Sequence, residues 1–290
     1  MNIPLHSDRL RVEIDEPGKH YTGTRFDWTG FITQVTLDGR HTFCQSESPD
    51  PAKGTGGRGL CNEFGIETPI GFDEAGPGGL FPKLGVGLLA RPDDKPYSFG
   101  QPYAITPFPI ETTLAPHAVR FVSKPMPCGG YAARLTKEIA VEENRLIISC
   151  RLENTGSKTI ETDEYTHNFV AIDNHPVGPE YTLTTAFPLA DGAATSPGLE
   201  IAANQVCWPE TVAPGKGFYH QNRNIPADAT SRWELRHNPS GIAISETADF
   251  PLFRFALWGM GHAVSPEMFC RISLPPGQTI SWKRTYQFSD

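Results

Sequence analysis

The stretch Arg-Leu-Ile-Ile-Ser-Cys-Arg-Leu-Glu-Asn-Thr-Gly (145–156) alternates apolar and polar side chains and then ends in a turn-forming tripeptide. Alternation at every second position is the period of a β-strand with one buried face, and Asn-Thr-Gly is typical of a turn. The same pattern recurs near the C-terminus in Arg-Ile-Ser-Leu-Pro-Pro-Gly-Gln (271–278). Both segments therefore predict strands that are closed by turns.

Similar alternating runs extend over most of the 290 residues. Asp38-Gly39, between two of them, predicts a hairpin. No window predicts a long helix, and the 28 glycines and 27 prolines suit many turns between short strands. We therefore expect an all-β fold and a single domain over residues 1–290. The runs that predict strands are 10–14, 31–37, 135–141, 146–152, 160–169, 181–185, 233–235, 242–245, 253–258, 269–274 and 280–288.

Residues 45–110 break the pattern, because Gly, Pro and Asp crowd together there. We interpret them as a long functional loop system laid over a rigid sheet. Residues 54–59 match the letters of a dinucleotide-binding motif, but no apolar strand precedes them and no helix follows, so we expect no nucleotide. Lys83 stands alone in an apolar, glycine-rich setting, either as a surface residue or as a ligand for a substrate oxygen.

The composition excludes several classes of function. A net charge of −8, with no run of Lys or Arg, gives no reason to expect nucleic acid or an anionic membrane as a partner. The six cysteines are spread widely, which predicts free thiols, and no His or Cys spacing predicts a metal site. We expect a cytoplasmic protein that needs no cofactor; the sequence leaves its oligomeric state open.

Two polar residues on strand-like segments are the best candidates for catalysis, His167 and Glu267. If residues 160–169 are extended, Asp163, Tyr165 and His167 share one face of the strand. Met268 begins the apolar face of the later strand, so Glu267 lies on the opposite face. The alternative is an ordinary core histidine and a solvated carboxylate.

The order of several short motifs resembles that of the galactose mutarotase-like superfamily, which includes the aldose 1-epimerases. The motifs are Thr-Arg-Phe-Asp-Trp-Thr-Gly (24–30), Phe-Pro-Lys-Leu-Gly (81–85), Leu-Glu-Asn-Thr-Gly (152–156), Tyr-Thr-His-Asn-Phe (165–169), and Glu267 ahead of Leu-Pro-Pro-Gly (274–277). The resemblance implies a large antiparallel β supersandwich. It also implies that His167 is the general acid and Glu267 the general base. The chain lacks the family's Asn-His-x-Tyr-Phe-Asn-Leu run.

Such a pair could interconvert the anomers of an aldose, because ring opening needs one proton removed from the C1 hydroxyl and one given to the ring oxygen. We expect His167 and Glu267 to bracket one pyranose ring across a cleft that residues 45–110 overhang. Trp28 is a further candidate for stacking on the sugar. The candidate substrate-binding residues are Arg25, Glu63, Lys83, Asp163, Tyr165, Arg254 and Trp258.

Two alternatives remain open. One is a carbohydrate-binding protein of the same fold without turnover. The other is a lyase or glycosidase in which Asp163 or Glu63 pairs with Glu267, because glycosidases commonly use two carboxylates. The expected ligand is a small sugar, phosphorylated and acidic aldoses included.

Overall fold

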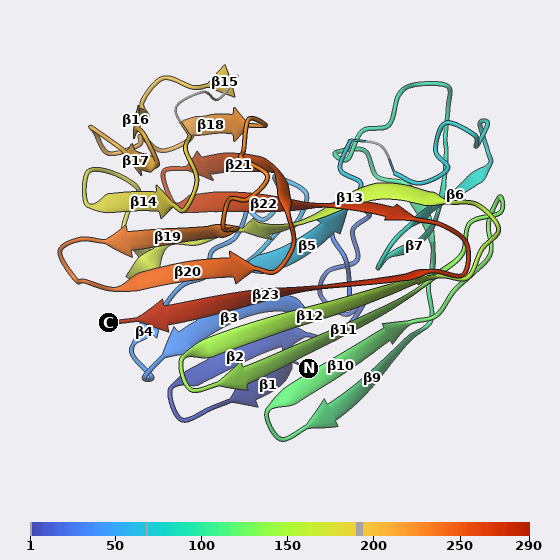
Figure 1. Cartoon of the computed structure of the whole chain (residues 1–290), viewed down its shortest axis with the longest axis horizontal. Coiled ribbons are helices and arrows are strands. Elements are labelled where there is room, and N and C mark those ends of the chain that lie inside the picture. Colours follow the sequence, from blue (N-terminus) through green and yellow to red (C-terminus); the bar gives the residue numbers. More distant parts are fainter. Residues whose placement is uncertain (1, 68, 190–193) are drawn as a thin grey trace.

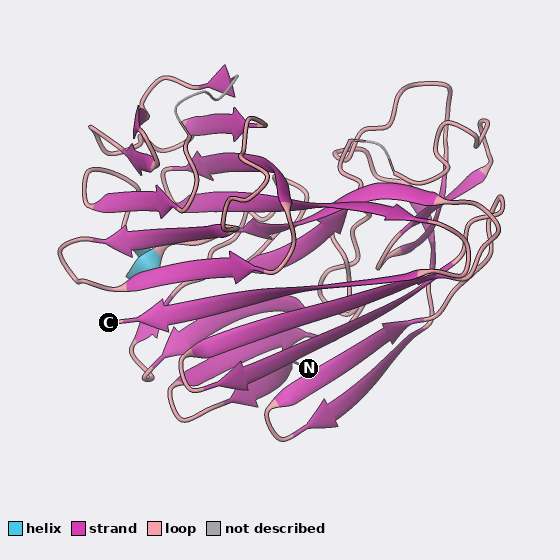
Figure 2. Ribbon diagram, viewed as in Figure 1, coloured by secondary structure: helices cyan, strands magenta, loops and turns pink. Residues whose placement is uncertain are grey.

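The computed structural model describes residues 2–67, 69–189 and 194–290. Two large antiparallel sheets pack face to face, and a small third sheet lies at the right-hand end of the view in Figure 1. The described chain is almost entirely strand and loop, with one 3-10 turn, η1 (Ile172–Asn174) (Figure 2). None of its helical structure is long and apolar enough to cross a membrane. The all-β supersandwich predicted from the sequence is confirmed.

The first large sheet carries the candidate catalytic residues. Its neighbours are hydrogen-bonded in the order β1-β2-β3-β5-β13-β22-β21-β18-β15, with β4 paired to β3. Its strands are β1 (Asn2–His6), β2 (Leu10–Asp15), β3 (Phe31–Leu37), β4 (His41–Thr42), β5 (Leu60–Phe64), β13 (Ile160–Asn168), β15 (Ala194–Thr195), β18 (Gly217–Asn222), β21 (Leu252–Met260) and β22 (Ala263–Leu274).

The second large sheet covers the inner face of the first, in the order β16-β17-β14-β19-β20-β23-β12-β11-β10-β9. Its strands are β9 (Ile110–Ala115), β10 (Ala118–Ser123), β11 (Ala133–Glu142), β12 (Arg145–Asn154), β14 (Tyr181–Thr185), β16 (Glu200–Ala202), β17 (Gln205–Cys207), β19 (Arg232–His237), β20 (Ala243–Ala248) and β23 (Thr279–Ser289). The small third sheet contains β6 (Leu80–Lys83), β7 (Gly87–Ala90) and β8 (Ala104–Pro107).

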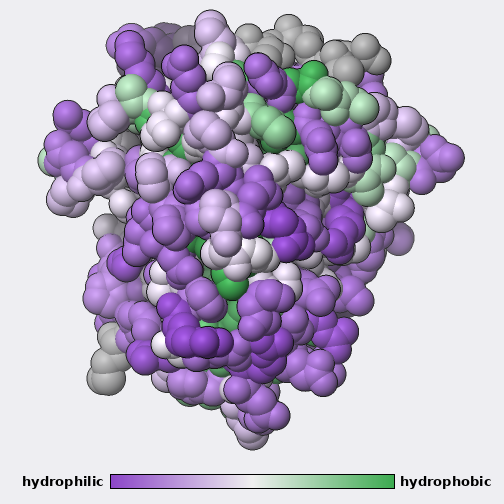
Figure 3. Space-filling model, turned by 90° about the vertical axis from the view of Figure 1, so that its left-hand side faces the viewer, coloured by the Kyte–Doolittle hydropathy of each residue, from purple (hydrophilic) through white to green (hydrophobic). Residues whose placement is uncertain are grey.

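The main core fills the space between the two large sheets. On β12 the predicted alternation is confirmed, because Leu146, Ile148, Cys150 and Leu152 are buried. Burial of an aliphatic side chain of this size contributes about 1.5–3 kcal/mol. The end of the molecule shown in Figure 3 is mostly hydrophilic, with hydrophobic residues in separate small groups.

A second, aromatic core lies on the outer face of the first sheet. It joins Phe31 of β3 and Phe169 to Phe81 and Leu89 of the small sheet. The first sheet is therefore covered on both faces near β5 and β13. This arrangement places the outer face of β13 in a protected setting.

The hairpin predicted at Asp38-Gly39 is confirmed, since Leu37 pairs with His41 and both turn residues have positive φ. The prediction of loops throughout residues 45–110 is wrong in part, because β5, β6, β7 and β8 lie within that segment. All five residues of β5 are buried, so this strand shows no alternation in the sequence. The short strands β6 to β8 lie between glycines and prolines, so the sequence shows no strand pattern there.

Candidate active site

A cavity of about 600 Å³ opens on the outer face of the first sheet. Strands β13, β18, β21 and β22 form its floor, and loops from residues 45–110 form much of its rim. A cavity of this size is ordinary for small-molecule ligands. It is lined by Arg25, Glu47, Ile66, Glu67, Tyr97, Ser98, Phe99, Tyr165, His167, Tyr219, Arg254, Trp258, Glu267 and Phe269.

His167 and Glu267 meet where two strands separate. Regular pairing between β13 and β22 stops at Glu164 and Cys270 and resumes just past the end of β13 with the bridge between Val170 and Val264, while β5 pairs with the opposite edge of β13. In the resulting gap, Nε2 of His167 lies 3.3 Å from Oε1 of Glu267, and both side chains are about 95% buried. The prediction that they bracket a sugar ring is therefore wrong: they touch each other on one wall of the cavity.

Ser265, which the sequence reasoning missed, holds this pair in place. Its hydroxyl lies 2.9 Å from Nδ1 of His167, donates to Oε1 of Glu267 at 3.0 Å, and accepts the backbone N–H of Asn168 at 2.8 Å. The single hydroxyl proton goes to Glu267, so Nδ1 of His167 donates to Ser265. Nε2 is then the nitrogen with a free lone pair, and it faces Glu267. Ser265 lies two residues before Glu267 and so on the same face of the strand, and this spacing could have identified it as a partner of Glu267.

The environment moves the two titratable groups in opposite directions. Burial, aided by the positive charge of Arg25, holds the pKa of His167 well below its usual value. Burial also raises the pKa of Glu267 to about 8, against the opposing hydrogen bond from Ser265. At neutral pH Glu267 is therefore protonated, and His167 is neutral with its single proton on Nδ1.

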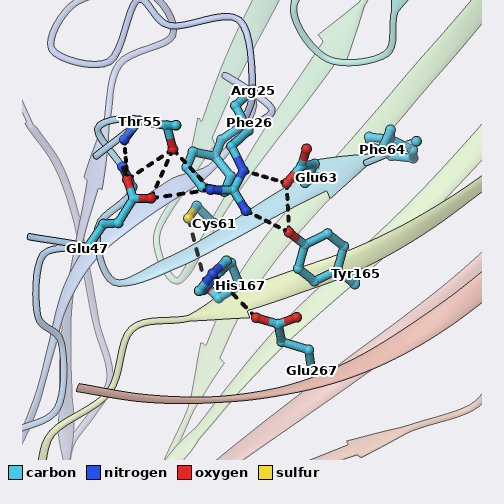
Figure 4. Close-up of polar contacts among 12 residues, drawn as sticks. Arg25, Phe26, Glu47, Thr55, Cys61, Glu63, Phe64, Tyr165, His167 and Glu267 are labelled. Carbon is cyan, nitrogen blue, oxygen red and sulfur yellow. Dashed lines mark hydrogen bonds and ion pairs between the residues drawn. The ribbon is translucent and has the colours of Figure 1, made fainter. Parts of the chain in front are cut away.

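A second cluster of polar side chains, centred on Arg25, lies beside this pair (Figure 4). Nε of Arg25 donates to Oε2 of Glu63 at 2.8 Å, and its Nη1 donates to Oε1 of Glu47 at 3.3 Å. The hydroxyl of Tyr165 donates to the same Glu63 oxygen at 2.6 Å. The guanidinium and the phenol thus reach the cavity already fixed by carboxylates, of which Glu63 is fully buried and Glu47 is partly exposed in the lining.

Three predicted substrate-binding residues lie behind the lining: Glu63, Lys83 and Asp163. The surface interpretation of Lys83 is wrong, because the residue is 1% exposed. Its ammonium donates to the carbonyl of Phe64 at 2.6 Å and lies 3.4 Å from Glu63. Lys83 therefore supports Glu63. Neither Asp163 nor Glu63 reaches the cavity to act as the second carboxylate of a glycosidase.

Aromatic rings surround the imidazole. The ring of His167 stacks on Phe169 with centroids 3.9 Å apart, and Trp258 meets it edge-on at 5.2 Å. Trp258, Tyr219 and Phe269 present further ring surface to the cavity. Trp28 does not contribute, because it lines a separate hollow with Ile3 and Pro107.

Among the described residues, one group has the residue types of a metal site: His175, Glu180 and His237. None of them lines the cavity. The two imidazoles stack with 7° between their planes and centroids 4.1 Å apart. In-plane lone pairs of parallel rings do not converge on one point, so this arrangement is not that of a tetrahedral donor set.

Comparison with models of protein families and with curated protein sequences gave no match. Solved structures do match over the full length. A galactose mutarotase-like protein from Lactobacillus casei covers 100% of both chains with a TM-score of 0.61 and 12% identity. The chain has the galactose mutarotase-like fold.

Two further structures with this fold support the assignment. A galactose mutarotase-related enzyme from Lactobacillus acidophilus has a TM-score of 0.61 and 11% identity, and the match covers 100% of this chain and 98% of that one. A galactose 1-epimerase from Lactobacillus acidophilus has a TM-score of 0.54 and 13% identity, with 99% and 94% covered. At these identities the galactose mutarotase-like fold is shared, and function must be argued from the site.

Proposed function

We propose that the chain is an aldose 1-epimerase that interconverts sugar anomers with His167 and Glu267 as its proton-transfer groups. The observation that carries this proposal is the contact between a buried imidazole and a buried carboxyl group inside a sugar-sized cavity. A base and an acid with opposite shifts in pKa are what this reaction needs.

The contact also fits the chemistry of the substrate. The C1 hydroxyl oxygen and the ring oxygen are bonded to the same carbon, so an acid and a base that lie side by side can serve both. Nε2 of His167 takes the hydroxyl proton, the bond from C1 to the ring oxygen breaks, and Glu267 gives its proton to the ring oxygen. Rotation about C1–C2 and the reverse transfers then close the other anomer.

The resting protonation reverses the roles that the family resemblance implied. Glu267 holds the proton and starts as the acid, while His167 starts as the base. The roles exchange in ring closure, so both groups return to their first state. Ser265 supports this assignment, because it holds Nδ1 as the protonated nitrogen of His167 and leaves Nε2 free.

Exchange NMR on a panel of free aldoses, uronic acids and aldose phosphates tests the proposal. We expect the wild-type protein to interconvert the two anomers of at least one sugar faster than buffer alone does. A protein that binds sugars from the panel but accelerates the exchange of none would instead be a carbohydrate-binding module.

A further inference from the structure

Arg254 lies in the cavity wall next to Glu267. On the paired strands β21 and β22, Arg254 is opposite Phe269 and Ala256 is opposite Glu267, so Arg254 and Glu267 are diagonal neighbours on one face. The guanidinium lies over the ring of Phe269, with Cζ 3.5 Å from the centroid, and the residue is 3% exposed. A cation this deeply buried needs a compensating anion.

The anion that compensates Arg254 is unusually exposed. Nη1 of Arg254 donates to Oε1 of Glu67 at 2.6 Å, yet the Glu67 side chain is 62% exposed. The other carboxylate, Asp163, is 3.7 Å from Arg254, and burial raises its pKa. By contrast, Arg25 is held by Glu63, whose side chain is 0% exposed. A buried partner is fixed, whereas Glu67 can turn out into water.

Glu67 also has a second cation on the outside. Nη2 of Arg223, on a side chain that is 49% exposed, lies 3.6 Å from the same oxygen of Glu67. Glu67 can therefore turn outward and keep an ionic partner. Nη1 of Arg254 would then face the cavity without a carboxylate.

We infer that Arg254 binds a carboxylate of the sugar, and that Glu67 occupies this place when no sugar is bound. The inference rests on the proposed function and names a substrate class for it: hexuronic acids. In a hexuronic acid the carboxylate is bonded to the carbon next to the ring oxygen. Glu267 protonates the ring oxygen in the proposed reaction and is the diagonal neighbour of Arg254. The ring oxygen and the carboxylate of the sugar would therefore reach adjacent side chains.

The charges of the lining agree with a monovalent anion. Arg25 is already paired with Glu63 and Glu47, and Lys83 is buried behind the lining. Among the described residues of the lining, Arg254 is the cation whose closest carboxylate partner is exposed and can be exchanged. One guanidinium matches one carboxylate in charge and in planar geometry. The protonated Glu267 adds no repulsion.

Titration of the protein with D-glucuronate and D-galacturonate, each against its neutral aldose, tests this inference by calorimetry and saturation-transfer NMR. We expect the uronates to bind about 10- to 100-fold more tightly, the worth of a charged hydrogen bond. Arg254→Gln should remove that preference. Glu67→Gln, a change at the exposed rim of the cavity, should tighten uronate binding because a neutral amide competes for Arg254 less than a carboxylate does. The control Glu138→Gln, outside the cavity, should have no effect.

Two results would overturn the inference: uronates that bind no better than neutral sugars, or uronate affinity that is the same in Glu67→Gln as in the wild type. Anomer exchange is measured separately on the same samples. Preferential uronate binding without faster exchange would refute the epimerase proposal and keep the carboxylate site. Faster exchange of neutral aldoses without uronate preference would do the opposite.

Discussion

The two faces of β13 carry polar residues at alternate positions and use them differently. The inner face presents Glu164, Thr166 and Asn168 to the space between the large sheets. There Arg284 bridges two carboxylates, with Nη2 2.7 Å from Glu164 and Nη1 2.6 Å from Glu246. Each oxygen of both carboxylates has a hydrogen-bond partner.

The outer face of the same strand presents Tyr165 and His167 to the cavity. Here no Lys or Arg of the described residues contacts Glu267, and its nearest partners are Ser265 and the imidazole of His167. Burial raises the pKa of Glu246 on the inner face, and direct contact with Arg284 opposes that rise. Burial raises the pKa of Glu267 to about 8, opposed by the hydrogen bond from Ser265 and by the more distant charges of Arg25 and Arg254.

This difference shows how one strand can serve stability and chemistry together. Where a buried carboxylate contacts a cation, the ion pair opposes the rise in pKa that burial causes and ties the group into the structure. Where burial is left uncompensated, the proton affinity moves into the range in which a group can act as an acid or base near neutral pH. We therefore expect substitutions on the inner face to lower stability and substitutions around the cavity to lower the rate.

The largest expected effect is on the outer face. His167→Asn should lower the rate of anomer exchange by about 10²–10⁴-fold, the usual worth of a general acid or base, with a much smaller change in sugar affinity. The double variant with Glu267→Gln should be little slower than either single variant, because the two groups act as one unit. Exchange NMR gives the rates, and multiplicative losses would show that the groups act independently.

On the inner face, Arg284→Met should lower the free energy of unfolding by about 3–5 kcal/mol, because it leaves Glu164 and Glu246 buried without a cation. Urea unfolding measures the change. The exposed Arg120→Met, which breaks only the surface pair with Glu138, should cost at most about 1 kcal/mol. Equal stability of the two variants would contradict a structural role for the inner network.

A smaller effect concerns stability and pH. The folded-state pKa of Glu267 is about 8, above its unfolded value, so the native state binds more protons between about pH 4.5 and 8. Its contribution to stability is therefore present at low pH and is lost as the pH rises through that range. Glu267→Gln should match the wild type near pH 4.5 and exceed it by a few kcal/mol at pH 8.5. A difference independent of pH would refute the shifted pKa.

The smallest effect is expected for Ser265→Ala. The change removes the hydroxyl that orients His167 and Glu267 but takes away neither proton-transfer group, so it should slow exchange about 2- to 10-fold. The rate should fall at alkaline pH, where Glu267 loses its proton. Because the Ser265 hydroxyl lowers the pKa of Glu267, removing the hydroxyl should move this fall to higher pH. Ser265→Thr, which keeps the hydroxyl, is the matched control. A rate loss with no movement of the pH profile would mean that Ser265 acts only in packing.

Alternation in the sequence was sufficient to predict the two faces of β13. It placed Tyr165 and His167 together and Glu164 and Thr166 opposite, as the structure does. It could not predict the contact between His167 and Glu267, because that depends on β13 pairing with β22 and on the interruption of their ladder between Glu164–Cys270 and Val170–Val264. The alternation of residues within one strand does not reveal which distant strand lies beside it or in which register the two strands pair.

The rim residues were missed for a different reason. Glu47, Glu67, Tyr97 and Phe99 lie on irregular loops, where no period relates a residue to the face it occupies. Arg25 was found only through the family resemblance. Its contacts with Glu63 and Tyr165, far away in the sequence, show why single residues could not be assigned roles from spacing alone.

The most direct test of the account compares anomer exchange in wild type and Glu267→Gln at pH 7, with one sugar that both proteins bind. We predict that the wild type exchanges the anomers well above the rate of buffer and that the folded variant, with unchanged sugar affinity, is about 10²–10⁴-fold slower. A variant that keeps the wild-type rate would contradict the assignment of the proton to Glu267. A wild type that binds the sugar and never exceeds buffer would contradict catalysis at this site.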